Sequence, residues 1–158
     1  MSAKEDQSLP TRLLLIRHAQ TEWNVQRRFQ GYGDSPITKE GQEQLKRLKS
    51  RLAGIVFDVV YSSDLGRAME TSQMLVGKKR VEESRLRERG VGILEGLNLE
   101  QIMADHADAF QAFRSGDKDH QIDGGESLQN ALNRVWAFLG EMPVKHVGAD
   151  LAAVSHAG

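Results

Sequence analysis

The sequence predicts an α/β fold, a three-layer αβα sandwich around a mainly parallel sheet. Short apolar runs alternate with segments of helical period, which is typical of a parallel sheet covered by helices. The 158 residues are about the length of one domain, and 39% of them are hydrophobic, enough to form a core. The absence of cysteine excludes a disulfide scaffold and a thiol nucleophile. We therefore expect residues 1–158 to form a single domain.

The first third of the chain contains one strand and one helix around a long loop. Residues 1–10 are polar and charged, and we interpret them as a loose leader. Residues 13–16 form a short apolar run, as in a strand buried on both faces of a parallel sheet. Residues 17–37 show no helical period, and a loop of about twenty residues inside a compact domain is more often functional than idle. Thr38 is positioned to cap a helix with leucines on one face.

Strand and helix signals alternate through the rest of the chain. Residues 58–61, 81–83 and 151–154 are predicted to be strands, and residues 62–64 supply caps for a helix that reaches Val76. Asn98 is expected to cap a helix that continues to Gly116.

A further helix with apolar residues from Leu128 to Leu139 follows the break at Gly124 and Gly125. Residues 89–150 are thus predicted to form a mostly helical insert over the site. The aromatic residues Phe110, Phe113 and Trp136 have the spacing of core residues. The alternative interpretation is that one or two of them line a pocket.

The charges argue against two classes of partner. The net charge is −1, with 21 basic and 22 acidic residues, which disfavours a nucleic-acid binder and a membrane-surface protein. The apolar run near the N-terminus is too short for a membrane span, so we expect a soluble, cytoplasmic protein. Residues 89–155 hold 5 basic and 10 acidic side chains, which places any anion site on the earlier part of the chain.

Basic side chains follow three predicted strands. Arg17 and His18 come directly after the first strand, His156 follows the last, and Arg67 lies in the first turn of the helix after the second. Ligands of open α/β sheets bind beyond the carboxyl ends of the strands. Arginine forks match phosphate oxygens, and a cationic imidazole would add a further donor, so this edge is predicted to bind a phosphate.

Each of these residues also has an ordinary structural interpretation. A histidine after a strand is usually a surface or hydrogen-bonded side chain. Arg67 alone is equally a solvated helix residue or an ion-pair partner of Asp64 or Glu70. Asn24 and Gln30 alone would be ordinary polar residues of a loop. Spacing therefore leaves both the phosphate site and the structural interpretation open.

Five motifs follow one another in the order found in a known family of proteins. They lie at residues 15–24 (LIRHAQTEWN), 28–38 (RFQGYGDSPIT), 61–71 (YSSDLGRAMET), 86–96 (LRERGVGILEG), and 125–127 with 154–158 (GES and VSHAG). This set resembles the histidine phosphatase superfamily, which includes cofactor-dependent phosphoglycerate mutases. Ala19 replaces the glycine most common after the family histidine. The chain stops two residues after His156, whereas family members continue, so we expect a truncated chain or incomplete sheet cover that exposes an apolar patch.

The resemblance implies covalent phosphoryl transfer. His18 would attack phosphorus while a backbone carbonyl holds its other ring nitrogen, and Glu88, still protonated near neutral pH, would protonate the leaving oxygen. The other implied residues are Arg17, Arg67 and His156 for charge neutralisation and Asn24, Gln30, Gly31 and Ala157 for phosphate binding. Glu126 and Ser127 are interpreted as structural. No metal-ligand spacing is present, and we expect neither a metal nor a cofactor.

Two related activities and one different class remain open. We favour a phosphomonoester hydrolase acting on a small phosphorylated metabolite, because the acidic second half is unsuited to clamping a bisphosphate and because Gln30 resembles the phosphatase branch. The alternatives are a cofactor-dependent phosphoglycerate mutase, which the segment from Glu88 to Asn98 resembles, and a phosphate-binding module without turnover. A homodimer is compatible with the sequence.

Overall fold

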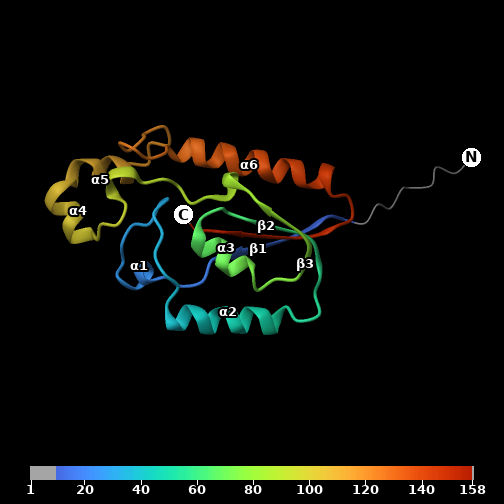
Figure 1. Cartoon of the computed structure of the whole chain (residues 1–158). Helices are drawn as coiled ribbons and strands as arrows, with labels where there is room; N and C mark the ends of the chain where they lie inside the picture. The colour runs from blue at the N-terminus through green and yellow to red at the C-terminus, as the bar shows by residue number, and fades with distance from the viewer. Residues whose placement is uncertain (1–9, 158) are drawn as a thin grey trace, which may run out of the picture.

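The fold is a three-layer αβα sandwich, seen here in a computed structural model that describes residues 10–157 (Figure 1). Four parallel strands form the central sheet in the order β1-β4-β2-β3. They are β1 (Arg12–Arg17), β4 (Asp150–Ser155), β2 (Phe57–Ser62) and β3 (Gly77–Glu82). The predicted fold class is confirmed. The proposed leader at residues 1–10 lies almost entirely outside the described residues.

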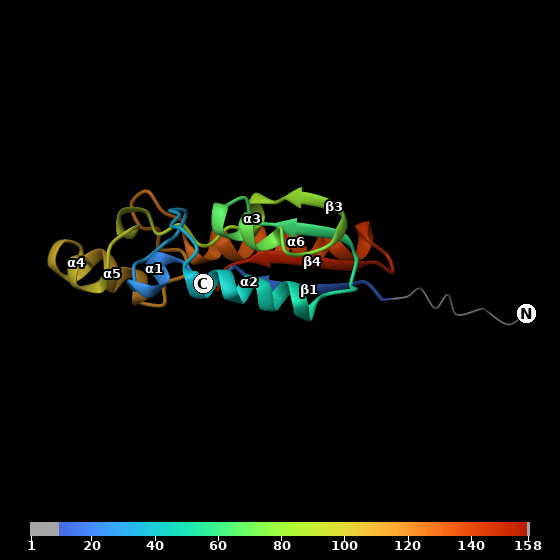
Figure 2. The same cartoon turned by 60° about the horizontal axis from the view of Figure 1, so that its bottom comes forward.

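Helices cover both faces of the sheet (Figure 2). On one face, α2 (Lys39–Arg51) and α3 (Gly66–Ser72) pack their apolar side chains against β2 and β4. On the other face lies α6 (Leu128–Lys145), the longest helix among the described residues. Thr38 caps α2 by accepting a hydrogen bond from the Gly41 N–H at 2.9 Å, as predicted.

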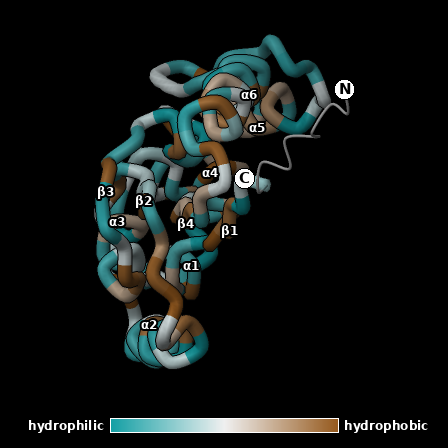
Figure 3. Tube along the Cα trace, turned by 90° about the vertical axis from the view of Figure 1, so that its right-hand side faces the viewer, coloured by the Kyte–Doolittle hydropathy of each residue, from teal (hydrophilic) through white to brown (hydrophobic). Residues whose placement is uncertain are grey.

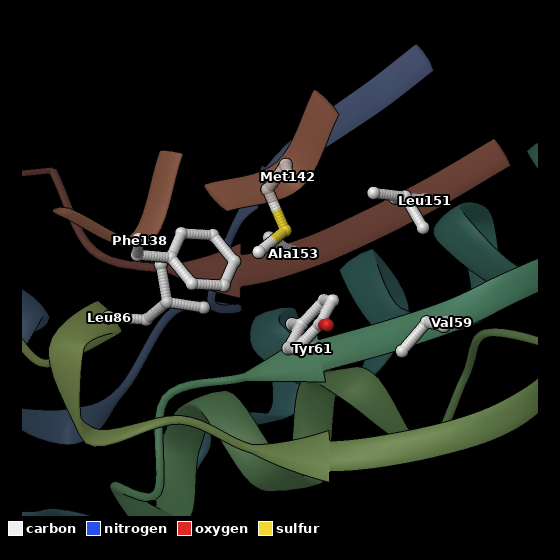
Figure 4. Packing of buried hydrophobic residues seen from close by; sticks show 7 residues of the cluster. All are labelled: Val59, Tyr61, Leu86, Phe138, Met142, Leu151 and Ala153. Atoms are coloured by element: carbon white, nitrogen blue, oxygen red, sulfur yellow. The ribbon is translucent and has the colours of Figure 1, made fainter. Parts of the chain in front are cut away.

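The core between α6 and the sheet fixes the position of that helix (Figure 4). Phe138 and Met142 of α6 are buried against Tyr61, Leu151 and Ala153. The Tyr61 and Phe138 rings meet edge to face, with centroids 5.1 Å apart, a favoured aromatic geometry. Burial of these side chains holds α6 against the face of the sheet.

The remaining elements gather beyond the carboxyl ends of the strands, at the left of Figure 1. They are α1 (Glu22–Val25), η2 (Gly92–Leu94), α4 (Leu99–Asp105) and α5 (Ala107–Arg114), whereas η1 (Ser84–Leu86) directly follows β3 and packs against α6. A third apolar cluster, which includes Leu94, Ile102 and Ile122, holds this end together. Helices α4 and α5 therefore lie at the end of the sheet, whereas α6 runs back along its face.

Two burial predictions were wrong. The first strand was expected to be buried on both faces, but Leu14 and Leu15 are 40% and 61% exposed because β1 pairs only with β4 among the described residues. Trp136 on α6 is 67% exposed instead of lying in the core. Exposed apolar side chains of the expected kind therefore lie on β1 (Leu14, Leu15) and on α6 (Leu132, Trp136). Figure 3 shows the course of both elements, coloured by hydropathy.

Two predicted helices also differ in extent. The helix after β2 ends at Ser72 rather than reaching Val76, and residues 62–64 do not cap it, since Ser63 accepts a hydrogen bond from the Leu65 N–H at 3.3 Å instead. The helix predicted after Asn98 is interrupted at His106, whose non-helical backbone angles (φ −139°, ψ 30°) separate α4 from α5. Among residues 10–157, no helix is long and apolar enough to cross a membrane.

Candidate active site

The site forms where β1 and β4 end side by side. Arg17 pairs in register with Ser155, so His18 and His156, the next residue of each chain segment, become neighbours with ring centroids 5.1 Å apart. His18 lines a cavity of about 290 Å³ with Arg67. His156 lines an adjoining cavity, about 300 Å³, and the two share four residues: Arg17, Glu88, Arg89 and Leu128. The predicted convergence of strand ends is confirmed.

His18 is held as a neutral imidazole with one nitrogen available. Its Nδ1 lies 2.7 Å from the Ala19 carbonyl oxygen, and because a carbonyl only accepts, Nδ1 carries the proton. Nε2 then carries the lone pair. Burial lowers the pKa of His18 to about 4, helped by the positive charges of Arg67 and Arg17. The ring is therefore unprotonated at Nε2 near neutral pH, the state that a nucleophile requires.

His156 is also neutral near pH 7, so the expected cationic imidazole was wrong for this structure. Burial and the nearby Arg67 charge lower its pKa to about 2. Its Nε2 lies 2.9 Å from the Ser63 hydroxyl oxygen, which already accepts the Leu65 N–H. With Ser63 as the donor of this hydrogen bond, the proton of the neutral His156 ring is on Nδ1, which is then an N–H donor.

Arg67 is the most buried charged side chain of the site, at 2% exposure. Its Nη1 donates to the Gly33 carbonyl at 2.7 Å and to Asp34 at 3.1 Å, and its Nη2 donates to the Gly31 carbonyl at 2.9 Å. Within the described residues, Arg67 Nε and His156 Nδ1 are buried without a hydrogen-bond partner. Buried polar groups are normally hydrogen-bonded, so these two unpaired nitrogens beside His18 are where a bound anion would complete the hydrogen bonding.

The loop after His18 adds two amides. Asn24 accepts the Thr21 N–H at its Oδ1, at 3.0 Å, which leaves Nδ2 as the donor end of that amide. Gln30 donates from Nε2 to the Thr21 hydroxyl, and its buried Oε1 has no partner in residues 10–157. Gly31 has φ +50°, and a Cβ there would lie 2.2 Å from a Glu95 oxygen, so both conformation and space require glycine.

Glu88 lies on the segment after η1 and lines both cavities. One carboxylate oxygen accepts the Arg89 N–H at 2.9 Å. Phe113 of α5 also lines the His18 cavity, so one of the predicted core aromatics belongs to the pocket wall. Ala157, expected to bind phosphate, is exposed and does not line the His18 cavity. The structure thus brings together every predicted site residue except Ala157.

Glu95 is a site-supporting residue to which the sequence analysis gave no role. Its carboxylate accepts the backbone N–H groups of Tyr32 at 2.9 Å, Gly33 at 3.0 Å and Val91 at 3.2 Å. It thereby fixes the loop whose carbonyls bind Arg67. The acidic residue was visible within the fourth motif, but the sequence could not show which backbone groups it meets. Among residues 10–157, no cluster of histidine and carboxylate side chains suits a metal ion.

The two buried histidines predict how stability depends on pH. Both pKa values, about 4 and about 2, lie below the ordinary 6.5, so the unfolded chain takes up protons first as the pH falls. Stability is fully present above pH 6.5 and is lost as the pH falls toward 4 for His18 and toward 2 for His156, by up to about 1.36 kcal/mol per pH unit for each histidine. We expect urea unfolding to show this slope between pH 6.5 and 5, and His18→Gln to reduce it by about half. An unchanged slope in that variant would contradict the assignment.

The fold and the site together define an enzyme that acts on phosphate esters. A buried neutral imidazole, surrounded by arginine and by buried N–H donors at the carboxyl edge of a parallel sheet, is the arrangement that this class requires. The chain belongs to the histidine phosphatase superfamily (branch 1), whose family model matches residues 13–158.

Among the similar proteins are one named as a phosphoglycerate mutase and one named as a phosphatase. The probable phosphoglycerate mutase GpmB of Salmonella choleraesuis is 34% identical over 145 residues, which cover 90% of this chain and 67% of that protein. The YhfR protein of Bacillus stearothermophilus superposes with a TM-score of 0.82 at 32% identity, over 92% of this chain and 74% of that one. The alpha-ribazole phosphatase of Shigella flexneri gives 0.82 at 30% identity, over 91% and 73%.

Proposed function

We propose that the protein is a phosphomonoester hydrolase that works through a phosphohistidine at His18. The observation that carries the proposal is the neutral, buried His18 imidazole, whose Nδ1 is committed to the Ala19 carbonyl at 2.7 Å. Its Nε2 is thereby left as the reactive nitrogen beside the unpaired donors of Arg67 and His156. A nucleophile and a preorganised set of donors for phosphate oxygens are the two requirements of phosphoryl transfer.

The first half-reaction moves the phosphoryl group to the protein. The lone pair of His18 Nε2 forms a bond to phosphorus as the bond from phosphorus to the ester oxygen breaks. The ester oxygen leaves with its electron pair and takes a proton from the carboxylic acid of Glu88. Arg17, Arg67 and His156 stabilise the charge on the other three oxygens, and Asn24 adds a neutral donor. The products are the free alcohol and phosphohistidine.

The second half-reaction returns the protein to its starting state. Glu88, now a carboxylate, takes a proton from a water molecule whose oxygen attacks phosphorus. The bond between Nε2 and phosphorus breaks, its electron pair returns to the ring, and inorganic phosphate leaves. The same residue therefore serves first as acid and then as base.

Gln30 favours hydrolysis over a mutase reaction. Gln30 lines the His18 cavity, and its buried Oε1 has no partner among the described residues. An oxygen acceptor repels a phosphate oxygen but accepts a hydrogen bond from water, so it suits a site that admits the attacking water. A mutase must in addition hold a second phosphate. Arg28 is a basic residue of the cavity wall, and its guanidinium already donates to Gly96 O at 2.6 Å and to Gln101 at 3.0 Å.

The cavity supports a small substrate with an apolar portion. Its volume is about 290 Å³, and Phe29, Val91, Phe113 and Leu128 line it beside the charged groups. A relative named as an alpha-ribazole phosphatase supports hydrolysis of such a metabolite, whereas the relative named as a phosphoglycerate mutase makes that reaction the second candidate.

Activity assays separate the candidates. We expect release of inorganic phosphate from p-nitrophenyl phosphate and from one or more members of a panel of phosphorylated metabolites, together with an acid-labile phosphoenzyme. Interconversion of phosphoglycerates that depends on 2,3-bisphosphoglycerate, without net phosphate release, would establish the mutase instead. Phosphate binding without turnover of any ester would establish a binding module.

A further inference from the structure

The segment that carries Glu88 has four consecutive backbone carbonyls held by two side chains. Arg134 of α6 donates from Nη1 to the carbonyls of Arg85 at 2.8 Å and Arg87 at 2.7 Å, and from Nη2 to that of Glu88 at 2.8 Å. The remaining carbonyl, of Leu86, accepts from the Ser155 hydroxyl at 2.8 Å. The backbone on both sides of Glu88 is thus fixed from α6 and from the end of β4.

Glu126 holds the Arg134 guanidinium in the required plane. Its two oxygens accept from Nε and Nη2 of Arg134, both at 2.8 Å, in a bidentate pair. The two side chains are 16% and 14% exposed. A pair this shielded from water costs desolvation energy, so it is a weak explanation of stability and a better one of specific geometry. A planar guanidinium with fixed donors suits that purpose, and a lysine does not.

Helix α6 connects the Arg134–Glu126 pair to the sheet that carries the two histidines. Phe138, one turn beyond Arg134, is fully buried against the sheet whose strand ends place His18 and His156. Ser155, which holds the Leu86 carbonyl, directly precedes His156. The distance between the Glu88 segment and the two imidazoles is therefore set by rigid elements rather than by a loop alone.

We propose that Arg134, held by Glu126, is a positioning residue that places the Glu88 carboxyl for proton transfer to the leaving oxygen. This inference rests on the proposed function, in which Glu88 is the acid. Arg134 acts through the backbone and does not itself touch the substrate. Misplacing an acid by about 1 Å costs about 10²-fold in rate when proton transfer matters.

The test compares leaving groups. Arg134→Met, Arg134→Lys and Glu126→Gln are assayed on p-nitrophenyl phosphate, whose leaving group needs little protonation, and on an alkyl phosphate, whose leaving group needs a proton. We expect kcat/KM to fall about 10²-fold further for the alkyl phosphate in both Arg134 variants. Glu126→Gln should fall less, because one hydrogen bond to Arg134 is retained. Lysine should not rescue the alkyl activity.

The matched control is Glu141→Gln. Glu141 also joins α6 to η1, through an ion pair with Arg85 at 2.8 Å, but it binds none of the four carbonyls. We expect it to leave the ratio of the two activities unchanged. Equal losses on both substrates in Arg134→Lys and Glu126→Gln would overturn the inference and assign Arg134 to folding alone. The wild-type chain serves to test the proposed function separately, because its failure to hydrolyse either ester would contradict that proposal itself.

Discussion

Replacing His18 with asparagine is expected to abolish turnover of every phosphate ester together with the acid-labile phosphoenzyme. The amide retains a polar group of similar size but has no nucleophilic nitrogen. Loss of a nucleophile in a covalent mechanism costs on the order of 10⁶-fold in kcat. Denaturing electrophoresis after brief incubation with a ³²P-labelled ester, followed by acid treatment, detects the intermediate.

The control for this variant is His106→Asn. His106 lies at the junction of α4 and α5 and does not line the His18 cavity. It should retain full activity. Asparagine has no ionisable group, so burying it does not require the loss of a proton. We therefore expect His18→Asn to fold and to bind inorganic phosphate. Turnover by the folded variant would refute the role of His18.

Arg67→Lys is expected to lower kcat/KM by about 10²- to 10³-fold. Lysine keeps the positive charge but not the fork that meets Gly31 O, Gly33 O and Asp34 at once. The loop that these groups anchor also carries Gln30, so the loss combines weaker charge stabilisation with a misplaced loop. Arg67→Met removes the charge as well and should lower the denaturation temperature, since a side chain 2% exposed leaves its partners unpaired.

Steady-state kinetics with inorganic phosphate as a competitive inhibitor measures both effects. The inhibition constant should rise in Arg67→Lys along with the loss of rate. The control is Arg47→Met, which removes an arginine whose partner Glu40 lies on the exposed side of α2, with side chains 63% and 55% exposed. A surface pair of this kind contributes little. An unchanged inhibition constant in Arg67→Lys would remove Arg67 from the phosphate site.

Much of the site could be predicted from the residues that directly follow the predicted strands. Arg17-His18 and Ser155-His156 directly follow short apolar runs, and parallel strands bring such positions to one edge of a sheet. The carbonyl partner of His18 was also expected, although only the structure identified it as Ala19. The phosphate-binding role of Ala157 stays a prediction, since this residue is exposed and does not line the His18 cavity. The prediction that the first strand is buried was wrong, because an apolar run does not reveal whether a further strand pairs with its outer edge.

The sequence by itself determined the αβα class, the order of the motifs and the side chains available for phosphate chemistry, because periodicity and local spacing carry that information. Tertiary structure alone decided that His156 is neutral, since its pKa depends on burial and on Arg67, 89 positions earlier. It alone revealed Glu95 beneath the Arg67 loop and Arg134 behind Glu88, whose contacts with Glu88 and Arg85 span 46 and 49 positions. Contacts between segments so far apart in the chain leave no periodic trace in it, and they exist only once the sheet and α6 have packed.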